Sequence, residues 1–334
     1  MSDAAELDQF LYRSNLAVPG DGITWTPLAG GVSSDIWRVD LPLQTICVKR
    51  ALATLKVAAD WQAPIERNNY EWEWFKFTHE HFPGIVPQPL AHNSEMQMLA
   101  MEYLEPEEFP VWKGELLDGV ADAVFAGKIG TCLGKIHSAS AGDDNIRERF
   151  ANDDFFFALR IEPYLLATAE KHPDIAIPIN VIARHTLALK IALVHGDISP
   201  KNILKGIRGP IFLDAETAWY GDPAFDLAFC LNHFLLKSVY NSSLAENYLK
   251  CFFQMIESYL IEVDWETPDM IEGRTAALLP ILLLARIDGK SPIEYLNDDH
   301  DRNLIRSVSR KFIAKAPKKL CTIAFELLSR LKKY

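Results

Sequence analysis

Long hydrophobic segments are missing from this sequence. The longest apolar run, residues 276–285, is about half the length of a membrane-spanning helix and contains Pro280. The first residues of the chain include acidic side chains where a secretory signal peptide would carry basic ones. We therefore expect a soluble, cytoplasmic protein with no membrane partner.

Cysteine and positive charge are both scarce. The five cysteines are odd in number, widely scattered and without CxxC spacing, which predicts buried free thiols in a reducing compartment. Lysine and arginine total 34 against 45 aspartates and glutamates, for a formal net charge of −11. Nucleic acid as the main partner would need a basic face, so no nucleic-acid partner is expected. The acidity mildly favours a cationic ligand.

The 334 residues are enough for two lobes. Alternating and helical apolar patterns predict strands over 23–28, 35–41, 44–50 and 96–104, with a helix over 68–81. After an acidic, proline-containing break at 105–110, the pattern is helical over 116–141, 155–169, 248–262, 271–287 and 301–330. We therefore predict an N-terminal lobe, 1–104, and a larger C-terminal lobe, 105–334.

The stretch Leu-Val-His-Gly-Asp-Ile-Ser-Pro-Lys-Asn-Ile-Leu, residues 193–204, carries the clearest chemical signal. A second apolar run ends at Asp214, and the glycine-containing linker between the two runs predicts an antiparallel hairpin. A hairpin folded about Arg208 places Asn202 opposite Asp214. Their amide and carboxylate oxygens suit Mg²⁺ held jointly with phosphates. Asp197 lies in the loop just before, close enough to accept a proton from a hydroxyl. Together these residues predict the acceptor half of a phosphoryl-transfer site.

Two blocks of this region resemble a known family. HGDISPKN at 195–202 matches the H-G-D-x-x-x-x-N loop of the aminoglycoside phosphotransferase and choline kinase-like enzymes, which share the protein-kinase fold. Asp-Ala-Glu at 214–216 and GDPAFDLA at 221–228 match that family's metal motif and the segment after it. The resemblance implies a bilobal α+β fold, with a small antiparallel sheet and one main helix in the N-lobe and a mostly helical C-lobe. It covers roughly residues 20–300, with sharp motifs only at 193–228.

The same resemblance implies an activity. ATP would give its γ-phosphoryl group to a hydroxyl of a small molecule, with Asp197 as the base and Asn202 and Asp214 as ligands of Mg²⁺. Glu216 is a candidate for the second metal position or for substrate contact. Lys49, at the end of a predicted strand, is the expected phosphate-gripping lysine. Glu71 and Glu73 compete to pair with it, and the family's spacing favours Glu71.

Other nucleotide contacts are implied at two places in the N-lobe. The Gly/Ser turn at 29–34 would cover the phosphates through Gly30, Gly31, Ser33 and Ser34, because glycine lets the backbone approach and hydroxyls donate. The end of the last predicted strand would pair its main chain with adenine, through Glu102 and Leu104 on either side of Tyr103.

The acceptor site is less sharply marked. Arg160 and Glu162, in an aromatic helical segment, are one pair of candidates, and Arg286 and Asp288, after the apolar run, are another. An aminoglycoside, a choline-like amine, an amino alcohol, a sugar and methylthioribose all fit this frame. The choice between ATP and GTP, the oligomeric state and the choice between a metabolic and a resistance role stay open.

The sequence disfavours three other activities. A protein kinase would carry Phe-Gly after Asp214 and an Ala-Pro-Glu-like segment further on, and this chain has neither. A catalytically silent nucleotide-binding module is disfavoured because Lys49, Asp197, Asn202 and Asp214 are all present. A metal-dependent hydrolase built on His195 and Asp197 would need more histidine ligands.

Overall fold

The computed structural model describes residues 3–29, 34–52 and 66–332. The chain divides into two compact units. The first unit consists of Met1–Phe109 and Ile211–Thr217, and the second of Pro110–Pro210 and Ala218–Tyr334. Segment 211–217, which carries the predicted metal motif, therefore belongs to the same unit as Lys49.

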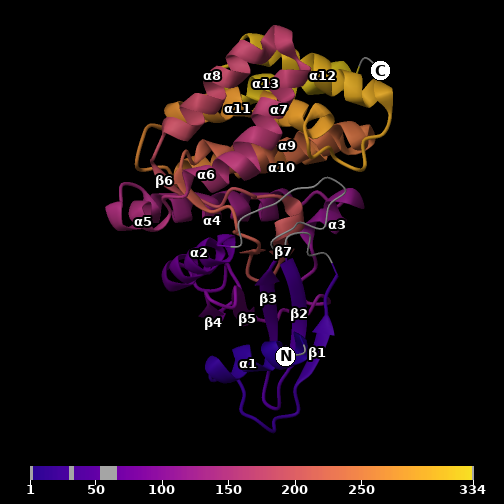
Figure 1. The fold of residues 1–334 in the computed structure, drawn as a ribbon. Helices are drawn as coiled ribbons and strands as arrows, with labels where there is room; N and C mark the ends of the chain where they lie inside the picture. The colour runs from indigo at the N-terminus through magenta and orange to yellow at the C-terminus, as the bar shows by residue number, and fades with distance from the viewer. Residues whose placement is uncertain (1–2, 30–33, 53–65, 333–334) are drawn as a thin grey trace. The chain divides into compact units, whose positions relative to one another are not determined.

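An antiparallel sheet forms the centre of the first unit (Figure 1). Its strands are β1 (Thr24–Pro27), β2 (Ser34–Asp40), β3 (Thr45–Ala51), β4 (Pro89–Asn93) and β5 (Met98–Glu102), in the order β1-β2-β3-β5-β4. Four of these strands were predicted. The edge strand β4 was missed because it begins at Pro89 and is half-buried throughout, so its sequence lacks the apolar alternation of a strand.

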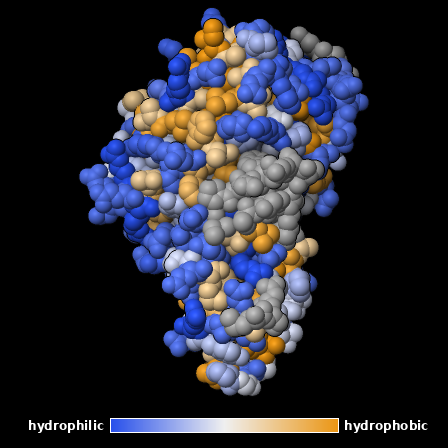
Figure 2. Space-filling model, in the orientation of Figure 1, coloured by the Kyte–Doolittle hydropathy of each residue, from blue (hydrophilic) through white to orange (hydrophobic). Residues whose placement is uncertain are grey.

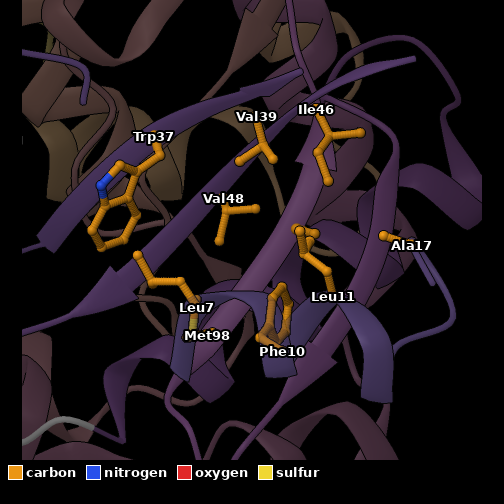
Figure 3. Close-up of a cluster of buried hydrophobic side chains, with 10 residues drawn as sticks. Leu7, Phe10, Leu11, Ala17, Trp37, Val39, Ile46, Val48 and Met98 are labelled. Carbon is orange, nitrogen blue, oxygen red and sulfur yellow. The ribbon is translucent and has the colours of Figure 1, made fainter. Parts of the chain in front are cut away.

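One face of the sheet packs against α1 (Asp3–Arg13). Leu7, Phe10 and Leu11 share one side of this helix because their spacing follows the helical repeat. Figure 3 shows them against side chains of the strands, which include Trp37, Val39, Ile46, Val48 and Met98. This cluster is the hydrophobic core that fixes β3 in place from one side.

The other face of β3 presents Cys47 and Lys49, since successive side chains of a strand alternate. It meets α2 (Arg67–His81), where Trp74, Phe75 and Phe77 are buried. The helix ends at His81, and its C-cap, Phe82, stands directly before a proline. Segment 211–217 joins this layer: the N–H of Phe212 donates to the carbonyl of Ile85 at 2.9 Å, and its ring lies edge-on to Trp74.

The second unit is mostly helical (Figure 1). Its longer elements are α4 (Ala123–Ser140), the π-helix η1 (Phe157–Leu166), α8 (Ala176–Ala188), α9 (Ala224–Tyr240), α10 (Ala245–Ile261), α11 (Pro268–Asp288), α12 (Asp299–Ala314) and α13 (Leu320–Leu331). Shorter ones are α3 (Trp112–Leu117), α5 (Asp144–Arg149), α6 (Asp153–Phe156) and α7 (Ala167–Lys171).

Two of the predicted helices are wrong as continuous elements. The one over 116–141 is broken, because Gly119 adopts a left-handed φ of 88° and the Asp122 side chain accepts the N–H of Phe125 to start α4. The one over 301–330 is divided into α12 and α13, with Pro317 in the break. Helical periodicity on both sides of a short break looks continuous in sequence.

The most apolar helices lie inside the second unit. Nearly every residue of α9 is buried, and α11 is buried around Pro280. On the face shown in Figure 2, hydrophilic and hydrophobic side chains are interspersed over this unit. Among the described residues, no helix has both the length and the apolar character needed to cross a membrane.

Short strands flank the HGDISPKN and Asp-Ala-Glu motifs. β6 (Ala192–Val194) pairs antiparallel with β9 (Trp219–Gly221), and β7 (Ile203–Lys205) forms a separate two-stranded sheet with β8 (Pro210–Phe212). The predicted hairpin is present, but its centre is half a residue earlier than expected. Gly206 and Gly209 exchange main-chain hydrogen bonds, so the turn is centred between Ile207 and Arg208.

Candidate functional site

In the first unit, a buried lysine joins two carboxylates. The ammonium of Lys49 lies 2.8 Å from Oε2 of Glu71 and 2.5 Å from Oδ1 of Asp214. Lys49 is 3% exposed and Glu71 is 1% exposed. Of the two glutamates considered, Glu71 therefore contacts the lysine, whereas Glu73 approaches Lys76 at 3.9 Å. Residues two positions apart on a helix point to different faces, so Glu73 does not share the direction of Glu71.

A second ion pair lies beside this cluster. Oε2 of Glu216 accepts a hydrogen bond from Nε of Arg67 at 2.7 Å, and Arg67 also donates to the carbonyl of Leu52. Arg67 lies one residue before the predicted start of α2, and no sequence signal singled it out. The pair holds Glu216 on the first unit and gives its carboxylate a structural partner.

The Lys49 cluster is rich in negative charge. Burial disfavours the ammonium, but Asp214, Glu71 and Glu216 outweigh it and raise the pKa of Lys49 well above its ordinary value. Burial, opposed by Lys49 and reinforced by the other two carboxylates, raises the pKa of Glu71 to about 7. Three carboxylates close together around one lysine favour the binding of a further cation.

Asp214 has an unusual backbone. Its φ is 66°, in the left-handed region that non-glycine residues seldom occupy. Asp and Asn tolerate this conformation better than other residues, at a cost of about 1 kcal/mol or more. The strained turn presents the carboxylate to Lys49, and such outliers concentrate at functional positions.

In the second unit, the HGD loop (residues 195–202) follows β6 directly. Gly196 has a φ of 80°, which makes the turn possible without a side chain. The first turn of α9 holds this turn: the carboxylate of Asp226 accepts the N–H of His195 at 2.7 Å and that of Gly196 at 2.8 Å. His137 is fully buried behind them, 2.8 Å from the hydroxyl of Tyr259. His137 is thus a packed residue of α4.

Two basic groups hold Asp197, which is 6% exposed. Oδ2 of Asp197 lies 3.2 Å from Nη2 of Arg160 and 3.1 Å from Nζ of Lys201. Arg160, on η1, also donates to the carbonyl of Gly196. π-Helical turns are frequent at functional sites, and this one aims a guanidinium at the HGD loop. The amide nitrogen of Asn202 donates to the carbonyl of Asp197 at 3.1 Å, which orients the amide oxygen away from that carbonyl.

A cavity of about 210 Å³ opens beside Asp197. It lies within the second unit, and elements distant in sequence supply its walls. The lining includes Lys113 of α3, Tyr164 of η1, Asp197, Ser199 and Lys201 of the HGD loop, Phe229, His233 and Lys237 of α9, Arg286 of α11, and Ser291, Glu294 and Tyr295 of the segment after it. Sequence reasoning found Asp197 and Arg286 but missed Lys113, His233 and Lys237, because isolated basic residues of helices carry no motif.

Lys237 is buried in this lining without a carboxylate partner among the described residues. Its ammonium lies 4.9 Å from the centre of the Tyr295 ring. Burial, together with Lys113 and Arg286 nearby, lowers the pKa of Lys237 to about 7. Burial also lowers the pKa of His233, so this histidine is neutral.

We expect Lys237→Met to stabilise the protein. Below pH 7 the wild-type protein bears the full cost of a buried ammonium, which fades as the pH rises from about 7 to the ordinary value of 10.5. The gain in free energy of unfolding is therefore largest at pH 7 and below, on the order of 2–3 kcal/mol, and shrinks toward pH 10. Urea unfolding at several pH values measures it. Lys315→Met, at an exposed position, is the control. Equal stability of Lys237→Met and wild type at pH 7 would contradict the expectation.

Two predicted acceptor residues lie elsewhere. Glu162 pairs with Lys290, and neither lines the cavity. Asp288 accepts from Arg306 at 2.8 Å and contacts His172 at 3.0 Å, which ties α11 to α12. Each of these two carboxylates is therefore paired with a basic side chain outside the cavity lining.

The predicted nucleotide contacts are only partly described. Gly30, Gly31 and Ser33 lie outside the described residues. Ser34 begins β2, and its buried hydroxyl has no partner among the described residues. The N–H of Glu102 already donates to the carbonyl of Gln88 at 2.9 Å, whereas the Leu104 main chain has no hydrogen bond to other described residues.

The chain belongs to the phosphotransferase enzyme family, whose model matches residues 24–250. It is similar to methylthioribose kinase of Bacillus cereus, with 22% identity over 255 residues that cover 68% of this chain and 64% of that relative. The chain thus spans less than two thirds of the length of the curated relative it matches. The comparison confirms the family predicted from the HGDISPKN and GDPAFDLA blocks.

Solved structures agree on the fold. An ethanolamine kinase from Plasmodium vivax has a TM-score of 0.59 and 13% identity, covering 92% of this chain and 88% of that one. Amicoumacin kinase in complex with AMP-PNP and Ca²⁺ has a TM-score of 0.55 and 12% identity, covering 96% and 98%. The predicted kinase-like α+β fold is confirmed.

Proposed function

We propose that this protein is an ATP- and Mg²⁺-dependent kinase that transfers the γ-phosphoryl group to a hydroxyl of a small molecule. One observation carries the proposal: the buried contact of Lys49 with both Glu71 and Asp214. A lysine held between a helix glutamate and a metal-binding aspartate is the arrangement that aligns nucleotide phosphates in kinases. Among its relatives and structural neighbours, methylthioribose kinase and ethanolamine kinase are small-molecule kinases by name.

The first unit binds the nucleotide in this proposal. Lys49 contacts the α- and β-phosphates, and the turn with Gly30, Gly31, Ser33 and Ser34 covers them. The buried hydroxyl of Ser34, which has no partner among the described residues, supports this role. The N–H of Leu104 is the adenine donor, while Glu102 contributes its carbonyl, because its N–H is already used within the unit. The amicoumacin kinase structure contains AMP-PNP, which supports a nucleotide in this fold.

Asn202 and Asp214 are the residues that would hold Mg²⁺, with Glu216 nearby in sequence. The donor set fits: an oriented amide oxygen and a carboxylate are hard ligands, and Mg²⁺ needs only one or two protein groups when phosphates supply the rest. In the described part of the chain, no group of three His, Cys, Asp or Glu side chains forms a metal cage. The ion would neutralise charge that develops on the phosphates.

Asp197 is the base. It orients the acceptor hydroxyl and takes its proton while the hydroxyl oxygen bonds to the γ-phosphorus and the bond to the β–γ bridging oxygen breaks, releasing ADP. Arg160 and Lys201 fix the carboxylate so that little reorganisation is needed at reaction. The transition state is loose, so positioning and charge supply most of the acceleration.

The test is ADP release. The purified protein with Mg²⁺ and ATP is screened against a library of hydroxyl-bearing metabolites, and we expect one chemical class to raise ADP release at least tenfold over the rate without acceptor. The phosphorylated product is then identified by mass spectrometry. Release that no small molecule stimulates, with phosphate appearing on proteins instead, would refute a small-molecule kinase. GTP in place of ATP tests nucleotide choice in the same assay.

We also propose that the activity belongs to the cytoplasm, where ATP and Mg²⁺ are available. All five cysteines are free, which suits a reducing compartment.

A further inference from the structure

The cavity beside Asp197 is basic, although the chain is acidic overall. Its lining has four basic side chains, Lys113, Lys201, Lys237 and Arg286, against two carboxylates, Asp197 and Glu294. Both carboxylates are already paired: Asp197 with Lys201 at 3.1 Å, and Glu294 with Lys113. Lys237 and Arg286 are therefore left without a counter-charge among the described residues.

A charged Lys237 is energetically unfavourable at this position. It is 1% exposed, and other cations face it. The groups around it are Lys113 from α3, Arg286 from α11, Glu294 and Tyr295 from the segment after α11, and Cys230 and His233 from its own helix. A buried cation without a partner is strongly unfavourable, so a ligand that supplies the anion offers a physical reason for it.

Polar atoms in the same lining also lack partners. Nε of Arg286, the hydroxyl of Tyr295 and the hydroxyl of Ser199 are buried and make no hydrogen bond to described residues. Nη1 of Arg286 donates to the carbonyl and hydroxyl of Ser291 at 2.6 and 3.0 Å, which fixes the guanidinium plane. All three orphan groups are donors, and oxyanions are acceptors. A guanidinium with a fixed plane is suited to carboxylate or phosphate.

We propose that the phosphoryl acceptor carries an oxyanion, a carboxylate or a phosphate, and that Lys237 and Arg286 bind it while Asp197 meets its hydroxyl. This inference rests on the proposed function, because it takes the cavity as the acceptor site. The cavity, at about 210 Å³, is also below the range of about 300–1,000 Å³ for drug-sized ligands. A small hydroxy acid or sugar phosphate fits it better than a multi-ring polycation. This proposal of an anionic acceptor differs from the cationic ligand that the net charge of the chain mildly favours.

Binding without turnover tests the subsite. The full-length protein is titrated calorimetrically with gluconate and glycerol phosphate, with sorbitol and glycerol as matched neutral probes and choline as the cationic one. We expect at least one anionic probe to bind tenfold or more tightly than its neutral match. Lys237→Met and Arg286→Gln should each weaken that binding about ten- to a hundredfold, since each removes a charged hydrogen bond. Lys315→Met, which removes the same charge from an exposed site, should not.

A proton count adds a second readout. At pH 8 a bound anion raises the pKa of Lys237, so binding takes up a proton from the buffer. Titration in buffers of different ionisation enthalpy measures this uptake, which should vanish in Lys237→Met. Choline binding more tightly than either anion, or Lys237→Met binding the anions as wild type does, overturns the proposal. Equal weakening of Mg-ATP and anion binding in Lys237→Met also overturns it, because the site would then hold nucleotide.

The two proposals fail differently. Anion binding that depends on Lys237, with no ADP release for any acceptor, keeps the subsite and refutes the kinase. ADP release that is faster with neutral or cationic acceptors than with all anionic ones keeps the kinase and refutes the subsite. Among anionic acceptors, gluconate and glycerol phosphate separate the carboxylate from the phosphate.

Discussion

Asp197→Asn is expected to slow phosphoryl transfer about 100- to 10,000-fold, the usual contribution of a positioned general base. The amide occupies the same space and still accepts one hydrogen bond, but it cannot take the proton of the acceptor hydroxyl. The KM for ATP should change little, because Lys49 and its partners are untouched. Steady-state ADP release with the best acceptor measures both constants.

The substitution also removes the carboxylate that neutralises Arg160, whose side chain is 10% exposed. A modest loss of stability, about 1–3 kcal/mol, is therefore expected, and thermal unfolding must show that the variant is folded at the assay temperature. Asp154→Asn, at an exposed position on α6, is the matched control and should retain wild-type rates. A near-wild-type kcat in folded Asp197→Asn would remove Asp197 from the role of base.

Asp214→Asn is expected to lower kcat/KM by about three orders of magnitude or more, because in the function we propose Asp214 binds the metal, and its loss removes charge stabilisation that is strongest in the transition state. Asparagine tolerates the φ of 66° at this position, so the turn should persist. The clearest signature is the metal requirement. Mg²⁺ should increase ATP affinity in wild type and lose most of this effect in the variant, as calorimetry at low and high Mg²⁺ would record.

The same variant leaves Lys49 paired with Glu71 alone. Since Asp214 and Glu216 both oppose ionisation of Glu71, its pKa, raised to about 7 in wild type, should fall when one of these charges is removed. Asp154→Asn again serves as the control. If Asp214→Asn keeps the wild-type dependence of ATP binding on Mg²⁺, then Asp214 is a structural partner of Lys49 and not a metal ligand.

Local sequence determined much of this protein. The HGD loop and the GDPAFDLA segment identified the family, because each function in them needs a particular side chain at a short, inflexible spacing. Strand alternation placed Lys49 on the face of β3 opposite the α1 core, because this relation spans a few residues within one element. Glu71 was favoured over Glu73 only by the family's spacing, and its contact with Lys49 is a relation between β3 and α2 that the structure supplies.

Tertiary structure decided the rest. Arg67 pairs with Glu216, and Lys237 lines one cavity with Arg286 and Tyr295. These residues are about 50 positions or more apart in the chain, which no local pattern records. Net charge says little about a site for the same reason: it sums the whole chain, whereas the electrostatic field in a cavity depends on the few charges that packing brings together in a place of low dielectric. The motifs in the sequence indicated phosphoryl transfer. The packing of α3, η1, α9 and α11 brought together the basic residues from which we propose an anionic acceptor.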